Sequence, residues 1–318
     1  MGQKVNPNTY RLGINKNWKT EFFEKKYKEL PVYIHKDLSI KSFIEKFLET
    51  QNLLLHNYKL NYSDFNLNIF ISYYVTSSFS TDKKLNLKVK KNKRSQKKKK
   101  NLKHDFSNKI KNYLIKNYKF LVFNSSFKTL ESIISQKNFM SNPNTYSLNK
   151  MTKILNLFLG NKFNITTTFK CINKIENLNI KKIQIIKKKL LLLSRFKNLS
   201  SFKETINIIF VITNYKNSSS LLSRFLALQL KKIKRQKFFL NFLKKTLYLF
   251  ISSNFSRIKG IKLIIKGRLN GVPKAKHKIL KIGDISIQTI DSNVDYSEST
   301  FHTVNGSYGI KVWIVEKN

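Results

Sequence analysis

Apolar positions in the first quarter of the chain fall into one helix-like run and two strand-like runs. Over residues 36–51 the apolar side chains recur at helical spacing, and Asp37 or Ser39 is suited to cap the start of a helix. Residues 52–60 and 67–75 follow, and in the second of these runs apolar residues alternate with the residues of the opposite face. The polar residues between them are good turn formers. This pattern predicts a helix followed by two paired strands.

The pattern changes after residue 75. Residues 83–103 contain KVKKNKRSQKKKKNLK, a block of like charges with almost no apolar residues, which predicts a disordered interaction segment. Further along, apolar clusters alternate with Lys and Asn. They predict helices over 107–117, 149–159 and 180–194, and a strand over 163–173.

The last third of the chain has sharper signals. Residues 205–213 (TINIIFVIT) form a short, β-branched apolar run, which predicts a buried strand. Ser218–Ser220 are suited to cap a following helix over 221–232, and a second helix is expected over 237–253. Four strand-like segments then complete the chain: 260–270, 274–282, 285–302 and 307–316.

Two dipeptides in this region predict hairpin turns. Asn270-Gly271 and Asn305-Gly306 each combine residues that accept a positive φ, as tight two-residue hairpin loops require. The last four strands are therefore expected to form a mostly antiparallel sheet.

The charge balance favours an RNA partner. The chain of 318 residues carries 62 Lys+Arg against 17 Asp+Glu, a net charge of +45. Such self-repulsion opposes compaction unless an anionic partner neutralises it, and nucleic acid does so with counterion release. A basic surface that is merely solvated is the alternative. An anionic membrane surface also fits the charge, but no apolar run approaches the roughly 18–20 residues that a spanning helix needs.

Composition also bears on where the chain is made. Phe, Ile, Lys, Asn and Tyr are common while Gly and Ala are scarce, a skew typical of AT-rich genomes such as those of many mitochondria. The chain begins directly with the motif MGQKVNPNTYRLGINKNW, so we expect no cleavable transit peptide. The single cysteine, Cys171, cannot form a disulfide within the chain. We therefore expect an organelle-encoded protein.

Motifs at both ends of the chain resemble one family. The opening MGQKVNPNTYRLGINKNW (Met1–Trp18), the segment GIKLIIKGRLNG (Gly260–Gly271) and VDYSESTFHTVNGSYGIKVWI (Val294–Ile314) are similar to small-subunit ribosomal protein three, the universal uS-three family. The resemblance covers roughly residues 1–75 and 204–318. It implies a mitochondrial-type member of that family, acting in the matrix on the mitochondrial ribosome.

The resemblance implies an α+β fold in two domains. A KH-like (type II) domain over 36–75 and about 204–236 follows an RNA-binding arm over 1–35. A lineage-specific insertion over 76–203 interrupts it, and a C-terminal ribosomal-protein domain over 237–318 follows. KH domains clamp nucleic acid with a GxxG loop, but the position after residue 75 lacks one. The chain's GxxG (Gly306–Gly309) belongs to the last hairpin. The third KH strand is expected at 205–213, with 163–173 as the alternative.

The two predicted helices around residue 235 carry the densest cluster of basic residues with interleaved phenylalanines. The apolar residues at this spacing are interpreted as core, and the basic residues as an outer face for RNA. The resemblance places this helix near the mRNA entry pore, with Lys244 and Lys245 matching a basic pair of the family. Leu240 and Asn241 stand where the family has two arginines, so a role in mRNA unwinding is in question. The expected RNA-binding residues here are Lys234, Arg235, Lys237, Lys244 and Lys245.

Two other regions supply candidate RNA contacts. In the extended arm, with a turn at Asn6-Pro7-Asn8, the candidates are Lys4 and Arg11. In the C-terminal domain a hairpin carries Lys266, Arg268, Lys274, Lys276, His277 and Lys278. Alternation places Lys274, Lys276 and Lys278 on one face of that hairpin. Trp313 and Ile314 are expected in the core.

Enzyme signatures are absent from the sequence. Five His and one Cys do not occur at metal-ligand spacing, and there is no phosphate-binding loop or dinucleotide fingerprint. No catalytic, cofactor-binding or metal-binding residue is expected. An organellar maturase or nuclease would need a carboxylate–metal site, and a free mRNA-regulatory protein with a KH fold would need the missing GxxG loop. Both remain as alternatives.

These patterns together predict a structural protein of the mitochondrial small ribosomal subunit. By resemblance, its partners are the rRNA of the subunit head, mRNA at the entry channel, and small-subunit proteins ten and fourteen. Its basic faces would neutralise phosphates and fix orientation without reading sequence. We expect no membrane span and no homo-oligomer.

Overall fold

Two four-stranded sheets and the helices packed on them make up the part of the chain that can be described. The computed structural model describes residues 5–24, 26–76, 145–160, 163–173, 189–233, 235–253, 256–271 and 276–317. A short helix, α1 (Pro7–Tyr10), and a two-residue strand, β1 (Thr20–Glu21), precede the first sheet. The predicted block of lysines over 83–103 and the helix predicted over 107–117 lie outside the described residues.

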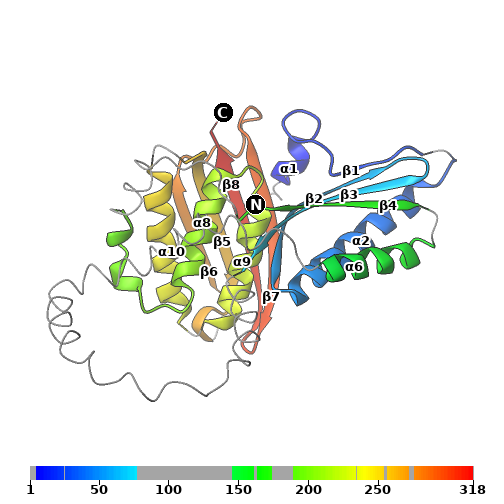
Figure 1. Cartoon of the computed structure of the whole chain (residues 1–318). Coiled ribbons are helices and arrows are strands. Elements are labelled where there is room, and N and C mark those ends of the chain that lie inside the picture. Colours follow the sequence, from blue (N-terminus) through cyan, green and yellow to red (C-terminus); the bar gives the residue numbers. More distant parts are fainter. Residues whose placement is uncertain are drawn as a thin grey trace, which may run out of the picture. The chain divides into compact units, whose positions relative to one another are not determined.

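The first sheet has the strand order β1-β2-β3-β4. Strands β2 (Leu53–Tyr62) and β3 (Asn66–Val75) are antiparallel, and β4 (Asn164–Cys171) runs parallel to β3. The helix α2 (Leu30–Thr50) and the helix α6 (Thr145–Phe158) lie side by side along these strands (Figure 1). The helix and the strand pair expected in the first quarter are confirmed, although α2 begins six residues earlier than predicted.

Alternation along β3 explains why both helices lie on the same face. Leu67, Ile69 and Ile71 are 0–1% exposed, and they pack with Ile44 of α2 and Met151 of α6 in one apolar core. A strand that buries alternate residues places them all on one side of the sheet. The helices therefore cover that side of the first sheet.

The segment predicted as a buried strand over 205–213 is a helix, and that prediction was wrong. The helix α8 spans Phe202–Asn214, and nine of its residues are buried. A short, uniformly apolar run carries no periodicity that separates a buried strand from a helix that is enclosed on most of its surface. The strand that completes the first sheet is β4, the alternative at 163–173.

The helix α9 (Ser219–Lys232) connects the two halves of the described fold. It packs against β2 of the first sheet and against β7 and β8 of the second. The side chain of Arg224 donates to the carbonyl of Leu55 and pairs with Glu45, while the hydroxyl of Ser220 donates to the carbonyl of His56. His56 is the extra residue where the β2–β3 register shifts, so α9 docks on a β-bulge.

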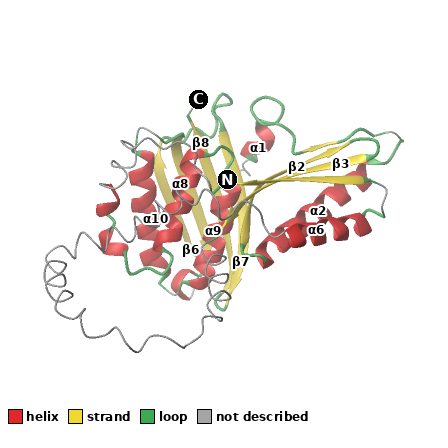
Figure 2. Cartoon of the chain, viewed as in Figure 1, coloured by secondary structure: helices red, strands yellow, loops and turns green. Residues whose placement is uncertain are grey.

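The second sheet is antiparallel throughout, with the order β6-β5-β8-β7. Its strands are β5 (Ile258–Gly267), β6 (Lys276–Gly283), β7 (Val294–Thr303) and β8 (Gly306–Glu316). The helices α8, α9 and α10 (Gln236–Ile251) lie in front of these strands in Figure 2. The predicted antiparallel sheet is confirmed, and residues 285–293 form a loop rather than the start of β7.

The two predicted hairpin turns differ in outcome. Val304 and Asn305 form the turn between β7 and β8, and Gly306 begins β8 with φ +125°. A side chain there would be strained, which accounts for glycine at this position. After β5 the chain forms a 3-10 turn over Leu269–Gly271 rather than a tight two-residue loop. The residues that continue to β6 lie outside the described part.

Candidate nucleic-acid interface

The exposed face of α10 carries a stripe of basic and polar side chains. Lys237, Asn241, Lys244, Lys245 and Tyr248 are all exposed, and their spacing places them on one side of the helix. The opposite side is buried, as the expected core assignment of the apolar residues requires. Its members are Phe239, Leu240, Phe242, Leu243, Leu247 and Phe250. The prediction of an apolar core with an outer basic face is confirmed for this helix, except at Phe238, which is 39% exposed.

Lys245 is held at one edge of the stripe. Its ammonium group lies 5.3 Å from the centroid of the Phe196 ring, in the range of a cation–π contact. The same ring packs against Phe238 and Phe242 at centroid distances of 5.1 and 5.3 Å. The segment around Phe196 therefore fixes this side of α10. Lys244 and Lys237 lie on the other side of the stripe.

The candidate residues of the C-terminal hairpin are divided between two faces of the sheet. In the register of β5 and β6, Lys278 is opposite the buried Ile265, and Lys276 lies two residues away on the same face. Lys266 and His277 are opposite each other and alternate with these residues, so they lie on the other face. The pair Lys276 and Lys278 is thus confirmed on one face, but the full set cannot act as a single surface.

The sheet face opposite the helices holds basic residues that the sequence reasoning missed. Lys262 lies 5.3 Å from the Trp313 ring, and Trp313 packs on Tyr296 at 5.1 Å. Lys311 pairs with Glu298 at 3.4 Å on the same face. Trp313 is only half-buried, so it is not the core residue that was expected. The alternation of the β8 segment KVWIV indicates that Trp313 faces away from the core, because its neighbours Val312 and Ile314 are buried.

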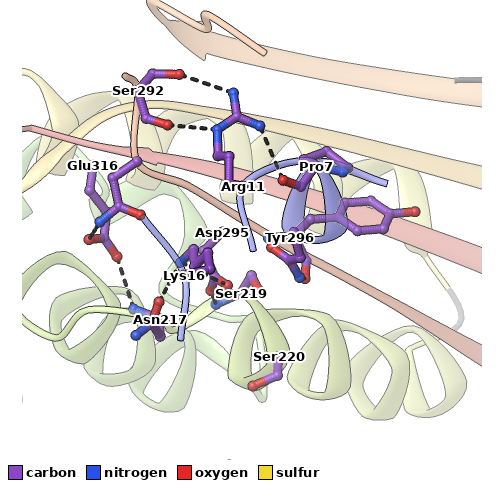
Figure 3. Close-up of polar contacts among 12 residues, drawn as sticks. Pro7, Arg11, Lys16, Asn217, Ser219, Ser220, Ser292, Asp295, Tyr296 and Glu316 are labelled. Carbon is purple, nitrogen blue, oxygen red and sulfur yellow. Dashed lines mark hydrogen bonds and ion pairs between the residues drawn. The ribbon is translucent and has the colours of Figure 1, made fainter. Parts of the chain in front are cut away.

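Arg11 does not have the role that the sequence suggested. Its side chain is 0% exposed and bonds to backbone oxygens of the loop before β7, of which Figure 3 shows that of Ser292. The guanidinium donates to the carbonyls of Ile287 (2.7 Å), Thr289 (2.6 Å) and Ser292 (2.8 Å), and to that of Pro7 at the start of α1 (3.2 Å). Burial lowers the pKa of the guanidinium from its ordinary value. A side chain so enclosed cannot contact a phosphate, and Arg11 is a structural anchor.

A second cluster fixes the residues that follow Arg11. Lys16 lies 3.7 Å from a carboxylate oxygen of Asp295, and it donates to the side chain of Asn217 at 2.5 Å. Asp295 also accepts from the backbone N–H of Ser219 at 2.7 Å, at the first turn of α9 (Figure 3). Glu316 accepts from the backbone N–H of Asn217 at 2.9 Å, and desolvation raises the pKa of that carboxyl. Instead of extending freely, the described part of the arm is therefore joined to α9 and β7.

The remaining predicted contacts are exposed or fall outside the described ranges. Arg235, Lys266, Arg268, Lys276 and His277 are exposed, and Lys278 is half-buried. Lys4, Lys234 and Lys274 lie outside the described residues. Within the described ranges, no three His, Cys, Asp or Glu side chains group closely enough to hold a metal ion.

No helix in the described stretches of the chain combines the length and apolarity needed to cross a membrane.

Comparison with known families covers the same region as the basic helix and the second sheet. The family model of the ribosomal protein S3 C-terminal domain matches residues 231–314, from the end of α9 to β8. This chain belongs to the ribosomal protein S3 family. That family is structural and non-enzymatic.

Individual relatives of the S3 family extend the match to other parts of the chain. The small ribosomal subunit protein uS3c of Guillardia theta is 33% identical over 109 residues, which is 34% of this chain and 47% of that protein. The protein of the same name from Euglena longa is 32% identical over 149 residues, 46% of this chain and 66% of that protein. The small ribosomal subunit protein uS3 of Phytoplasma mali is 24% identical over 317 residues, 99% of this chain and 84% of that protein.

Proposed function

We propose that this chain is a structural RNA-binding protein of the small subunit of an organellar ribosome. The observation that carries the proposal is the exposed basic stripe on α10, which lies within the segment similar to the S3 C-terminal domain. Several relatives bear names of the uS3c form. The net charge of +45 agrees with a partner made of phosphates.

The proposed mechanism is neutralisation of phosphates by a rigid scaffold. Lysines on α10 and on the second sheet contact the RNA backbone, which fixes the orientation of the protein without reading sequence. The buried anchor at Arg11 holds the N-terminal residues against the second sheet. RNA contacts from the arm then come from its other basic residues, and Lys4 remains the candidate.

We assign the first sheet with α2 and α6 to a KH-like unit. The order helix–strand–strand–helix–strand, with β4 parallel to β3, supports this assignment. The unit then consists of residues 30–75 and 145–171, because the segment once expected as its third strand is α8. The segment over 77–142 stands where a KH domain has its GxxG loop. We therefore expect this unit to contact RNA through side chains rather than through a backbone clamp.

We place the protein in the mitochondrion, in the head of the small subunit, as a single copy. The amino-acid composition is typical of AT-rich genomes and supports a mitochondrial gene. The relatives with uS3c names favour an organelle without deciding which one. The family resemblance supports head rRNA, mRNA at the entry channel, and proteins ten and fourteen as partners.

Sedimentation of organelle lysates tests the ribosomal assignment. The tagged protein should migrate with the small subunit in magnesium and shift to light fractions when EDTA unfolds the subunit. A tagged matrix enzyme of similar size serves as the control and should stay in light fractions in both buffers. If the protein is found mainly in RNA-free fractions with magnesium present, the proposed function is wrong. Running the same assay on separated mitochondria and plastids decides between the two organelles.

A further inference from the structure

The aromatic side chains of α10 differ in their exposure to solvent, and packing in the apolar core does not explain the most exposed of them. Phe239, Phe242 and Phe250 are at most 4% exposed, and Phe238, which is 39% exposed, packs against Phe196 at a centroid distance of 5.1 Å. Tyr248 is more exposed than any of these phenylalanines, at 63%. Tyrosine is also a weaker helix former than the lysines beside it. Neither packing nor helix propensity accounts for an aromatic ring at this position.

The neighbours of Tyr248 are groups that bind RNA backbone. Lys244 precedes it by one turn, Asn241 by two turns and Lys237 by three turns, all exposed on the same side of the helix. At about 1.5 Å of rise per residue, the stripe from Lys237 to Tyr248 is about 16 Å long. It presents two ammonium groups, one amide and one aromatic face along a single line.

We propose that Tyr248 is a stacking platform for an unpaired RNA base, and that Lys244 and Lys237 hold the phosphates of the same strand. Single-stranded nucleic acids are bound where a basic track runs beside exposed aromatic rings, because every base presents a face that can stack. The amide of Asn241 can donate to or accept from a base edge or sugar. The inference rests on the proposed function, which it deepens by naming the ligand of α10 as single-stranded rather than paired RNA.

In this arrangement the lysines and the tyrosine contribute to RNA affinity in two different ways. Lysine contacts depend on salt, because each neutralised phosphate releases counterions. Stacking on a neutral ring releases none, so its loss lowers affinity without changing the salt dependence. Stacking also requires an unpaired base, so a fully paired RNA does not gain from Tyr248.

The test uses the full chain and a single-stranded RNA of about twelve uridines with one 2-aminopurine. Affinity is measured over a range of KCl concentrations, and stacking is measured by quenching of the 2-aminopurine. The variants are Tyr248→Ala, Tyr248→Phe and Lys244→Gln. Phe65→Ala is the matched control, since Phe65 is a 75% exposed aromatic residue in the turn between β2 and β3.

We expect Tyr248→Ala to lower affinity about tenfold, to abolish quenching, and to leave the salt slope unchanged. Tyr248→Phe retains a ring and should bind as the wild type does, as should Phe65→Ala. Lys244→Gln should reduce the salt slope by about 0.7, the value for one contact to a single strand, and keep the quenching at saturation. A blunt-ended RNA duplex without unpaired bases should bind equally to the wild type and to Tyr248→Ala.

Three results would overturn the stacking role. They are wild-type affinity and quenching in Tyr248→Ala, equal losses in the Phe and Ala variants, or an equal loss for the paired RNA. If Tyr248→Ala binds RNA normally but recovers less of the other subunit proteins, the ring belongs to a protein interface and the inference is wrong. In each case sedimentation with the subunit is unaffected, so failure of this inference is distinguishable from failure of the proposed ribosomal function.

Discussion

At the scale of single residues, burial decides which basic groups are available to RNA. Sequence alone assigns Arg11 and Lys244 the same role, since both are basic residues in segments that resemble the S3 family. The structure separates them, because Arg11 is 0% exposed with its N–H groups bonded to carbonyls, while Lys244 faces solvent. The charge of a residue can be read from the sequence. The exposure of Arg11, however, depends on a loop more than 270 residues further along the chain.

Replacing Arg11 should therefore lower the stability of the protein. Arg11→Ala leaves the carbonyls of residues 287, 289 and 292 without their donor, which costs about 2–4 kcal/mol in the free energy of unfolding. Urea unfolding followed by circular dichroism measures this effect. The control is Arg195→Ala, because Arg195 is exposed. Equal unfolding midpoints for the two variants contradict the anchor role.

His56 gives the stability a dependence on pH. It is 8% exposed, its Nδ1 is 2.9 Å from the Ser72 hydroxyl, and desolvation lowers its pKa from 6.5 to about 4. Below pH 6.5 the unfolded state binds a proton at this residue, whereas the folded state does so only below about pH 4. The contribution of His56 to stability is therefore complete above pH 6.5 and falls by about 3 kcal/mol on acidification to pH 4.

The measurement is the free energy of unfolding at several values of pH between 4 and 7.5. Asparagine in place of His56 can retain a hydrogen bond to Ser72 but does not titrate, so His56→Asn should flatten the profile. His302→Asn is the control, since His302 is exposed and lies in β7. A profile of unchanged steepness in His56→Asn shows that another group causes the pH dependence.

At the scale of elements, periodic segments could be predicted and uniformly apolar ones could not. The α2 helix, the β2–β3 pair and the last sheet follow from alternation and helical spacing, because one side of each element is buried and the other is not. The α8 helix buries nine residues, so its sequence lacks the contrast that reveals helical period. The candidate site divides in the same way: the stripe on α10 is periodic and was predicted, whereas the division of the hairpin lysines depends on the β5–β6 register.

The α9 helix shows a cap that no local pattern reveals. Ser218 is at the N-cap position, but its hydroxyl donates to the carbonyl of Ile212, and Asp295 of β7 accepts from the N–H of Ser219 instead. A carboxylate at a helix N-terminus is also favoured by the helix dipole. Asp295→Ala should reduce the free energy of unfolding by about 1–2 kcal/mol.

Thermal unfolding compares this variant with Asp291→Ala, which removes an exposed carboxylate from the loop before β7. The Asp291 variant should unfold as the wild type does. If both variants lose the same amount of stability, the effect arises from the change in net charge and not from the cap on α9.

At the scale of the whole molecule, the net charge of +45 favours binding to an anionic partner. Double reversal of the exposed pair on α10, Lys244→Glu with Lys245→Glu, should leave assembly into the subunit largely intact. It should slow translation of messages with structured leaders, because the incoming strand loses two phosphate contacts. The effect should be smaller than in a relative that has two arginines where this chain has Leu240 and Asn241.

Translation in organelle extracts and crosslinking of incoming mRNA to α10 check this expectation. The control variant is Lys46→Glu with Lys59→Glu, which reverses two exposed lysines on α2 and β2. Crosslinks from α10 to rRNA alone, with normal translation of structured messages, would contradict the proposed role of this helix at the mRNA entry.

The anchor at Arg11 also sets an order of events during synthesis. Its acceptors at Ile287 and Ser292 are 276 and 281 residues further along the chain. At about ten residues per second, they leave the translating ribosome roughly half a minute after Arg11 does. Throughout that time the guanidinium has no partner from this loop. Closure of the N-terminal segment is therefore a late step, and in a nascent chain that ends before residue 287 the basic N-terminal segment lacks its acceptors in this loop.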